Sequence, residues 1–196
     1  MPAMSAVESA FCRSASWGAM AHRIIVPWSL QQAPLGSQVL EIGAGDGAMA
    51  ARILADHPDI SMTVTDVDPI MVAAARQRLA RYGARADVAQ ADATGLPFAS
   101  EVFGSVVSFL MLHHTLRWEL VLGEAMRVLR PGGWLVGYDL LSTRSTRVLH
   151  QLDRSPFRLI RSDEIEPAFE QFAVQRVVIR QSARGQVVRF MVQKSQ

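Results

Sequence analysis

Three glycines stand at alternate positions directly after an apolar run, in Val39-Leu-Glu-Ile-Gly-Ala-Gly-Asp-Gly47. Glycine permits a sharp turn and lets a ligand approach the main chain without a side chain in the way. If a helix starts near Ala48, its first amide groups point at whatever is bound. The run therefore predicts a ligand-binding turn between a strand and a helix, with a purely structural turn as the alternative.

An acid follows the next expected strand. Asp66 ends the run Met62-Thr-Val-Thr-Asp66, 23 residues after Gly43. An acid about 20 residues beyond such a glycine turn can bind both hydroxyls of a ribose. Asp68 also has a suitable spacing, but Pro69 follows it, which is typical of the residue that caps a helix N-terminus. We therefore prefer Asp66 for the ribose.

Two nucleoside ligands fit this pattern, a nicotinamide dinucleotide and S-adenosylmethionine. With Ala48 as its last position, the turn also satisfies the dinucleotide pattern G-x-G-x-x-G/A. Four acids are expected around the turn, namely Glu41, Asp46, Asp66 and Asp92. Placing these negative charges close to the negative pyrophosphate of a dinucleotide costs electrostatic energy. The same acids attract the positive sulfonium and ammonium groups of S-adenosylmethionine. The acidic surroundings thus favour S-adenosylmethionine.

Candidate acid–base residues follow two later strands. His113 and His114 come after the apolar run 105–110, and Asp139 comes after the run 134–138. If a bound sulfonium donates its methyl group, the transfer mainly requires alignment of the reactants, and a base is needed only if the acceptor must lose a proton. We take these three residues as catalytic candidates, with Tyr138 and His150 as further ones; a loop hydrogen bond or a strand-end cap is the structural alternative. No spacing typical of metal ligands is present, so no metal is expected.

Strands and helices must alternate to place these residues at one edge. The pattern predicts strands at 37–43, 62–66, 86–90, 105–110 and 134–138, and helices at 48–54, 70–82 and 118–129, with a turn at 131–133. Such alternation requires right-handed crossovers and a parallel sheet covered by helices. The fold class is α/β, a Rossmann-like, doubly wound and mostly parallel seven-stranded sheet with helices on both faces.

The two ends of the chain differ from this core. Residues 5–33 suggest one or two helices ending near Pro27 or Pro34. Beyond the core, the pattern predicts a helix at 162–172 and strands at 174–180 and 187–192, which a short link forces to pair antiparallel. We expect a single domain over 1–196, with an N-terminal helical segment (1–35), a cofactor-binding core (36–139), and a substrate-side segment with a C-terminal hairpin (140–196).

Five motifs in order resemble the class I S-adenosylmethionine-dependent methyltransferases, in particular the small single-domain group that includes quinone-biosynthesis enzymes. They are the glycine turn, Asp66-Val-Asp-Pro-Ile-Met71, Asp92-Ala-Thr-Gly-Leu-Pro-Phe98, Leu112-His-His114 and Arg127-Val-Leu-Arg-Pro-Gly-Gly133. The similarity covers about residues 39–139. The chain departs from the family at Phe103-Gly104, where an acid usually follows the phenylalanine.

The resemblance implies roles for individual residues. Gly43, Ala44 and Gly45 would line the methionine part of the cofactor with Glu41 behind them, and Asp66 with Val67 would hold the ribose. Asp92 and Ala93 would meet the adenine, with Asp92 accepting a hydrogen bond from its amine. Phe109 and Leu110 would lie near the reacting methyl. The implied activity is methyl transfer to oxygen, nitrogen or carbon of a small molecule.

Composition and charge limit the kinds of partner that the chain is expected to have. The sequence has 196 residues, a formal net charge of +2 and one cysteine, which excludes a disulfide within the chain; Cys12 is interpreted as a small core residue. No apolar run approaches the length needed to span a bilayer, and we expect a cytoplasmic protein. Residues 140–196 hold 10 basic and 5 acidic side chains, but the arginines are scattered without interleaved aromatics, so a nucleic acid is not the expected partner.

Two alternatives stay open beside the small-molecule enzyme. The acceptor could be RNA or protein, bound through the basic tail, or the chain could be a regulatory protein that binds the cofactor without catalysis. The acceptor pocket is expected between residues 5–33 and 140–165, and the oligomeric state is left open.

Overall fold

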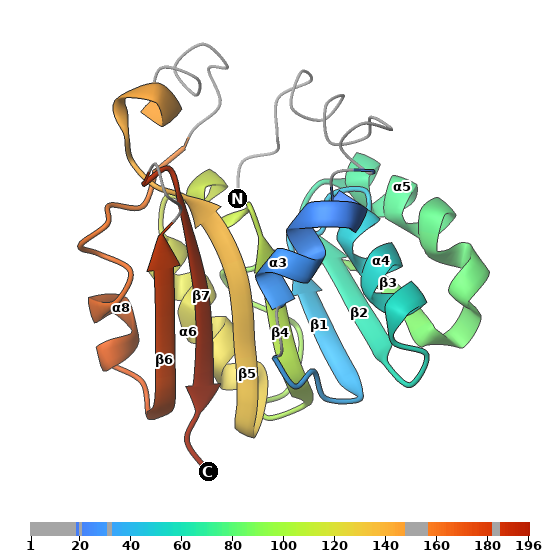
Figure 1. The fold of residues 1–196 in the computed structure, drawn as a ribbon. Helices are drawn as coiled ribbons and strands as arrows, with labels where there is room; N and C mark the ends of the chain where they lie inside the picture. The colour runs from blue at the N-terminus through green and yellow to red at the C-terminus, as the bar shows by residue number, and fades with distance from the viewer. Residues whose placement is uncertain (1–18, 20, 31–32, 148–156, 182–184) are drawn as a thin grey trace.

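The computed structural model describes residues 19, 21–30, 33–147, 157–181 and 185–196. Their centre is a seven-stranded sheet in the order β3-β2-β1-β4-β5-β7-β6 (Figure 1). The strands are β1 (Gln38–Ile42), β2 (Ser61–Asp66), β3 (Ala86–Gln90), β4 (Phe103–Phe109), β5 (Leu129–Leu140), β6 (Val174–Gln181) and β7 (Val187–Lys194). The first five are parallel to one another, whereas β7 pairs antiparallel with both β5 and β6. The predicted mixed α/β sheet with a C-terminal antiparallel hairpin is confirmed.

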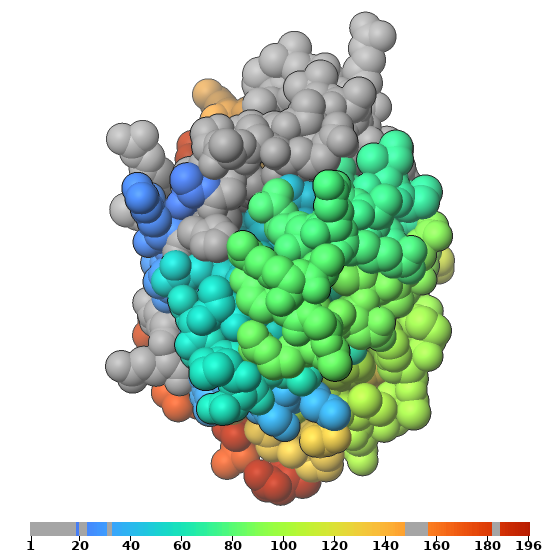
Figure 2. Space-filling view, turned by 90° about the vertical axis from the view of Figure 1, so that its right-hand side faces the viewer, coloured from blue at the N-terminus to red at the C-terminus, as the bar shows by residue number. Residues whose placement is uncertain are grey.

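Helices cover both faces of the sheet because alternate strand residues are apolar on both sides. Val39 and Val107 pack in one core cluster with the helices α3 (Val26–Leu30) and α4 (Ala48–Asp56), whereas Leu40 and Val106 pack in a second cluster with α6 (Trp118–Val128). Figure 2 shows the side of the molecule on which α4 and α5 (Pro69–Leu79) form the surface. The nearly continuous burial of β4 agrees with its predicted position inside the sheet.

Short turns complete the described elements. A π-helical turn, η1 (Ala21–Ile25), leads into α3, and 3₁₀ turns form η2 (Ala80–Arg85) and η3 (Leu112–His114). None of the described helices has the length and apolar character needed to cross a membrane. The expectation of a single domain stays a prediction.

Proline explains two differences from the predicted helices. Pro27 is the second residue of α3, which follows η1 directly, so this proline does not end the helical segment. The helix predicted at 162–172 is reduced to α8 (Pro167–Glu170), since Pro167 has no amide hydrogen to continue a helix from the preceding turn. The prediction of a helix over residues 162–166 was therefore wrong.

Glycine explains two further differences. The helix predicted to reach Tyr82 ends as an α-helix at Leu79 and continues as η2, in which Gly83 leaves helical geometry with φ +56°. The turn predicted at 131–133 lies within β5 as an irregularity: Phe103 pairs with Leu129, and Ser105 pairs with Trp134. The chain thus bulges out without ending the strand.

Gly104 has a packing reason for departing from the family pattern. A Cβ atom at this position would lie 3.0 Å from the Cα atom of Gly36. The two backbones therefore approach too closely for an aspartate side chain at residue 104.

Candidate functional site

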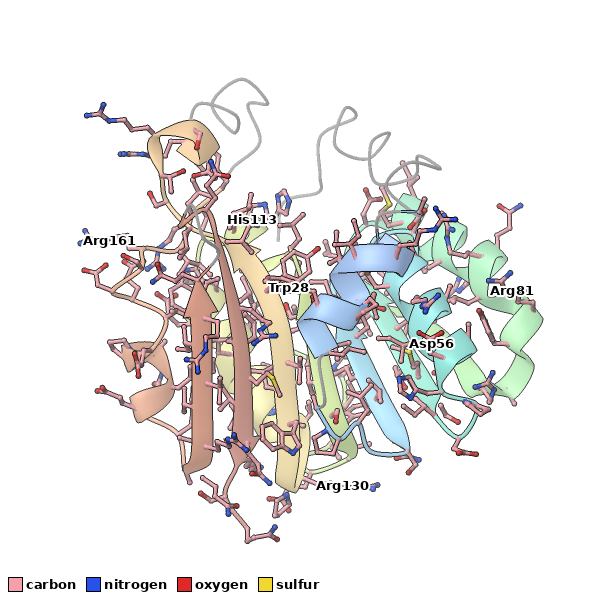
Figure 3. All side chains as sticks on the ribbon, viewed as in Figure 1. Trp28, Asp56, Arg81, His113, Arg130 and Arg161 are labelled. Carbon is pink, nitrogen blue, oxygen red and sulfur yellow. The ribbon has the colours of Figure 1, made fainter. Side chains whose placement is uncertain are left out.

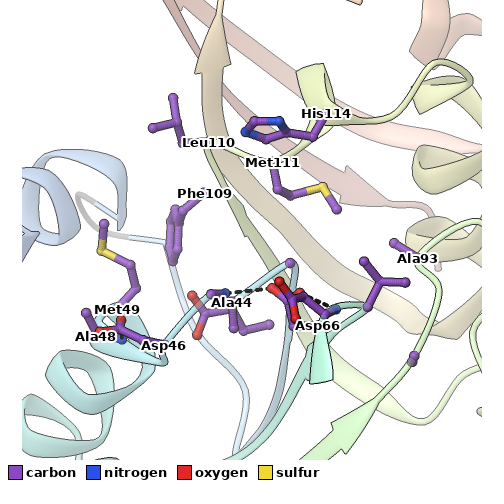
Figure 4. A pocket seen from close by; sticks show the side chains of 16 residues that line it. Ala44, Asp46, Ala48, Met49, Asp66, Ala93, Phe109, Leu110, Met111 and His114 are labelled. Atoms are coloured by element: carbon purple, nitrogen blue, oxygen red, sulfur yellow. Dashed lines mark hydrogen bonds between the residues drawn. The ribbon is translucent and has the colours of Figure 1, made fainter. Parts of the chain in front are cut away.

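A cleft opens where β1, β2 and β4 end (Figure 4). The space within it is about 800 Å³ when the open solvent at its mouth is included. The carboxyl ends of parallel strands around a crossover are where α/β sheets bind their ligands. The lining residues are Glu41, Gly43, Ala44, Gly45, Asp46, Ala48, Met49, Asp66, Val67, Asp68, Ala91, Ala93, Phe109, Leu110, Met111 and His114.

The glycine turn offers bare backbone to this cleft. Gly43 and Gly45 have φ angles of +64° and +56°, in the left-handed region that favours glycine. A Cβ atom on Gly43 would lie 2.7 Å from the Met111 side chain, whereas a Cβ atom on Gly45 would meet nothing within 4 Å. Gly43 is therefore required by packing, and Gly45 faces open space that a ligand can fill.

Asp66 closes the turn from the neighbouring strand. Its Oδ2 atom accepts a hydrogen bond from the Gly45 amide at 2.8 Å, and its Oδ1 atom accepts one from the Asp68 amide at 2.9 Å. Burial raises the pKa of Asp66, and these amide bonds oppose the rise. Asp68 has the expected capping role, because its Oδ1 atom accepts from the Ile70 amide at the start of α5.

Two more acids, Glu41 and Asp46, lie beside the turn, and they differ in burial and in their partners. Glu41 is 1% exposed, and its Oε2 atom has no hydrogen-bond partner among the described residues. Burial, with smaller contributions from Asp46 and Asp66, raises the pKa of Glu41 to about 8. Asp46 instead forms an ion pair with Arg78. The cleft thus holds one compensated carboxylate and one buried carboxyl group whose ionisation a bound cation would favour.

The opposite wall comes from the end of β4 and from η3. Phe109, Leu110, Met111 and His114 lie across the cleft from Asp66 (Figure 4). Leu110 has φ 58°, a conformation that costs a non-glycine residue about 1–2 kcal/mol, and its amide donates to the Tyr138 carbonyl at 2.9 Å. Such backbone strain is concentrated at ligand sites.

His113 and Asp139 form a buried pair behind this wall. The His113 ring nitrogen Nδ1 lies 2.6 Å from Asp139 Oδ1, and the two side chains are 2% and 0% exposed. Asp139 also accepts from the amides of Leu112 and Leu140. The ring of His114 stacks on that of His113 with centroids 4.1 Å apart. The pair therefore ties the end of β5 to η3, and His114 is the member of the trio that lines the cleft.

The structure brings most of the predicted cofactor residues together. Glu41, Gly43, Ala44, Gly45, Asp66, Val67, Ala93, Phe109 and Leu110 all line the cleft. Asp92 lies outside the lining, where its Oδ1 atom accepts from the amide and hydroxyl of Thr94. Burial acts to raise the pKa of Asp92, but these bonds are among the contacts that lower it overall.

Some lining residues were not predicted from the sequence, and some predicted ones lie elsewhere. Met49, Ala91 and Met111 are apolar residues without a pattern that marks them as ligand contacts. Cys12 and His150 lie outside the described residues, as do positions 5–18, 20, 31–32 and 148–156 of the two segments expected to form the acceptor pocket. No group of metal-ligating side chains occurs in the described part of the chain.

Comparison with known proteins finds that part of this chain is similar to methyltransferases. Residues 39–133 match the family model described as a methyltransferase domain. YodH of Bacillus subtilis, described as an uncharacterized methyltransferase, is 39% identical over 101 residues, which are 52% of this chain and 42% of YodH. The ubiquinone/menaquinone biosynthesis C-methyltransferase UbiE of Cereibacter sphaeroides is 32% identical over 127 residues, which are 64% of this chain and 51% of UbiE. The chain thus spans about half the length of these relatives, or less.

A solved structure supports the fold. The phosphoethanolamine N-methyltransferase 2 of Haemonchus contortus, solved in complex with S-adenosyl-L-methionine, aligns with a TM-score of 0.73 at 16% identity. The alignment covers 85% of this chain and 51% of that one. At this identity, the likeness concerns the fold.

Proposed function

Because this chain is a class I S-adenosylmethionine-dependent methyltransferase by family, we propose that it transfers a methyl group from S-adenosylmethionine to a small, partly apolar acceptor. The observation that carries the proposal is the convergence of Gly45, Asp66 and Glu41 in one cleft. This convergence combines a bare backbone turn, a carboxylate fixed by two amides and a buried carboxyl oxygen without a described partner.

These groups fit the parts of the cofactor. The open space at Gly45 admits a ligand against the main chain. Each Asp66 oxygen accepts one amide bond and keeps a second lone pair, which suits the two hydroxyls of a ribose. The buried Glu41 carboxyl suits the positive charge of an ammonium or sulfonium group. We assign Gly43, Ala44, Gly45 and Glu41 to the methionine part on this basis.

The same proposal assigns the other lining residues to parts of the cofactor. Val67 and Ala93 would flank the ribose and adenine, and Phe109 with Leu110 would face the reacting methyl. The role of Asp92 as acceptor from the adenine amine stays a prediction, with Ala93 as the neighbour that lines the cleft. The cofactor supplies a methyl group that is already activated for displacement, so the protein's main task is to align the acceptor with it.

His114 is the residue we assign to proton removal from the acceptor, where the acceptor has a proton to lose. It lines the cleft on the same wall as Phe109 and Leu110. His113 and Asp139, the other two catalytic candidates, are buried behind it. Their hydrogen bond and the stacked rings would hold His114 in place, so we assign both as positioning residues.

Transfer of a radiolabelled methyl group tests the proposal. Purified protein would be incubated with labelled S-adenosylmethionine and separate sets of phenols, amines and quinols, and S-adenosylhomocysteine would be quantified. Saturable turnover with one set, lost in a Gly45→Val variant that still folds, would support the small-molecule enzyme. Tight cofactor binding without turnover in any set would favour the non-catalytic alternative, and turnover only with RNA or protein would contradict the acceptor class.

A further inference from the structure

A second hollow lies on the face of β5, β7 and β6. These strands are at the opposite end of the sheet from β3 (Figure 1). We call it the arginine groove; it is lined by Pro34, Trp134, Arg176, Val178, Arg180, Arg189 and Met191. It shares no lining residue with the cofactor cleft. The function proposed above leaves this groove unexplained.

The register of the hairpin concentrates positive charge in the groove. Side chains alternate along a strand, so Arg176, Val178 and Arg180 share one face of β6. Arg180 pairs directly with Arg189, and Val178 pairs directly with Met191. Like charges placed directly opposite each other across an antiparallel pair are destabilising.

No described carboxylate compensates these arginines. Arg180 donates to the Ile179 carbonyl, and Arg189 donates to the Trp28 carbonyl at 2.9 Å. The Arg189 guanidinium also lies 5.7 Å from the centre of the Trp28 ring, which stands in front of β5 in Figure 3. Burial, together with the charge of Arg180, lowers the pKa of Arg189. The groove thus holds fixed positive charge that an anion would relieve.

Protection of the sheet edge explains only part of this pattern. Charged residues on an edge strand discourage pairing with other chains, which accounts for Arg176 and Arg180 on β6. Arg189 lies on β7, which has a neighbour on each side, and it is 6% exposed. A nearly buried arginine on an inner strand does not protect the sheet edge from pairing with another chain. The contacts with Trp28 hold Arg189 in place, and a ligand shared by both guanidinium groups would relieve the repulsion between Arg180 and Arg189.

We propose that the arginine groove binds a small organic anion. A carboxylate or phosphate group lies between Arg180 and Arg189, because the planar guanidinium fork matches both groups. The apolar body of the ligand lies on Val178, Met191 and Trp134 along the floor. The hollow shape and this apolar floor favour a small amphiphilic molecule over a flat anionic surface.

Titration with simple amphiphiles tests the site. Hexanoate and hexyl phosphate are the anionic probes, and hexan-1-ol is the neutral control. Binding is followed by calorimetry and by tryptophan fluorescence. Fluorescence is suitable because Trp134 lines the groove and the Arg189 guanidinium lies over the ring of Trp28. We expect saturable binding of at least one anion, weaker binding of the alcohol, and a loss of affinity as salt is raised. Comparison of the two anions shows whether carboxylate or phosphate is the natural head group.

Variants of Arg180, an exposed residue, make the test specific. Arg180→Gln should weaken anion binding about tenfold, the effect of one lost charge-assisted hydrogen bond, whereas Arg180→Lys should keep much of it. Arg161→Gln is the matched control, because Arg161 is exposed and pairs with Asp163 away from the groove. All three should bind S-adenosylhomocysteine as the wild type does, so failure of this site and failure of the proposed function are separable. Equal affinity of Arg180→Gln and wild type, equal binding of the alcohol, or binding of an acidic peptide but neither anion would overturn the proposal.

Discussion

Replacement of Asp66 by alanine probes the ribose assignment. The variant removes the two carboxylate oxygens that accept from the Gly45 and Asp68 amides at 2.8 and 2.9 Å. A hydrogen bond to a charged group contributes about 1.5–3 kcal/mol. At about 1.4 kcal/mol per factor of ten, the loss of one such bond to the ligand weakens cofactor binding about 10- to 150-fold.

Calorimetric titration with S-adenosylhomocysteine measures this loss. Asp68→Ser is the matched control, because serine can also cap the N-terminus of α5. Since the capping contact is kept, we expect the affinity of this variant for S-adenosylhomocysteine to stay within about twofold of the wild type. Asp66→Asn keeps one oxygen acceptor and should fall between alanine and the wild type. Unchanged affinity in Asp66→Ala, or an equal loss in Asp68→Ser, would refute the reasoning that gives the ribose to Asp66.

Three other predictions concern the turn, the buried acid and the histidines. Gly45→Ala and Gly83→Ala both place a Cβ at φ +56° with nothing within 4 Å. Gly45→Ala should lower the free energy of unfolding by about 1–2 kcal/mol, and Gly83→Ala should lower it by at least as much, because the Gly83 ψ of −132° lies outside the left-handed helical region; in titrations only Gly45→Ala should lose cofactor affinity. Burial raises the pKa of Glu41 in the folded state from its ordinary 4.5 to about 8, so the folded state binds more protons, and wild-type stability should fall by up to about 1.4 kcal/mol per pH unit as the pH rises between these values; urea unfolding of Glu41→Gln should lack this slope, and an identical slope would contradict the burial argument. His113→Ala should destabilise the fold by about 3 kcal/mol because it leaves Asp139 buried without its partner, whereas His114→Ala should lower turnover while cofactor affinity holds; wild-type turnover in His114→Ala would remove that residue from the mechanism.

Local sequence was sufficient to predict the sheet. The apolar and β-branched runs of β1, β2, β4 and β5 end at turn residues, and the link at 182–185 leaves only an antiparallel pairing for the last two strands. The failures have local causes that compete with periodicity. Pro167 truncates the helix expected at 162–172, and the residues 131–133 bulge within β5 because pairing with β4 resumes at Trp134.

The sequence predicts which residues lie together at the ends of neighbouring strands. It does not predict which way their side chains point. Gly45 and Asp66 meet because both follow neighbouring parallel strands. Neither the contact of Met111 with Gly43 nor the division of roles between His113 and His114 follows from spacing, because both depend on how Asp139 anchors η3. The opposition of Arg180 and Arg189 depends in the same way on the hairpin register, which the sequence pattern alone does not specify.

Direct titration of the wild-type chain with S-adenosylmethionine and NAD⁺ is the measurement closest to the central claim. A cleft lined by a bare glycine turn and four acids should bind the sulfonium nucleoside saturably and the dinucleotide far more weakly, in calorimetry and as a rise in unfolding temperature. No binding of S-adenosylmethionine at millimolar concentration, or tighter binding of NAD⁺, would contradict the account.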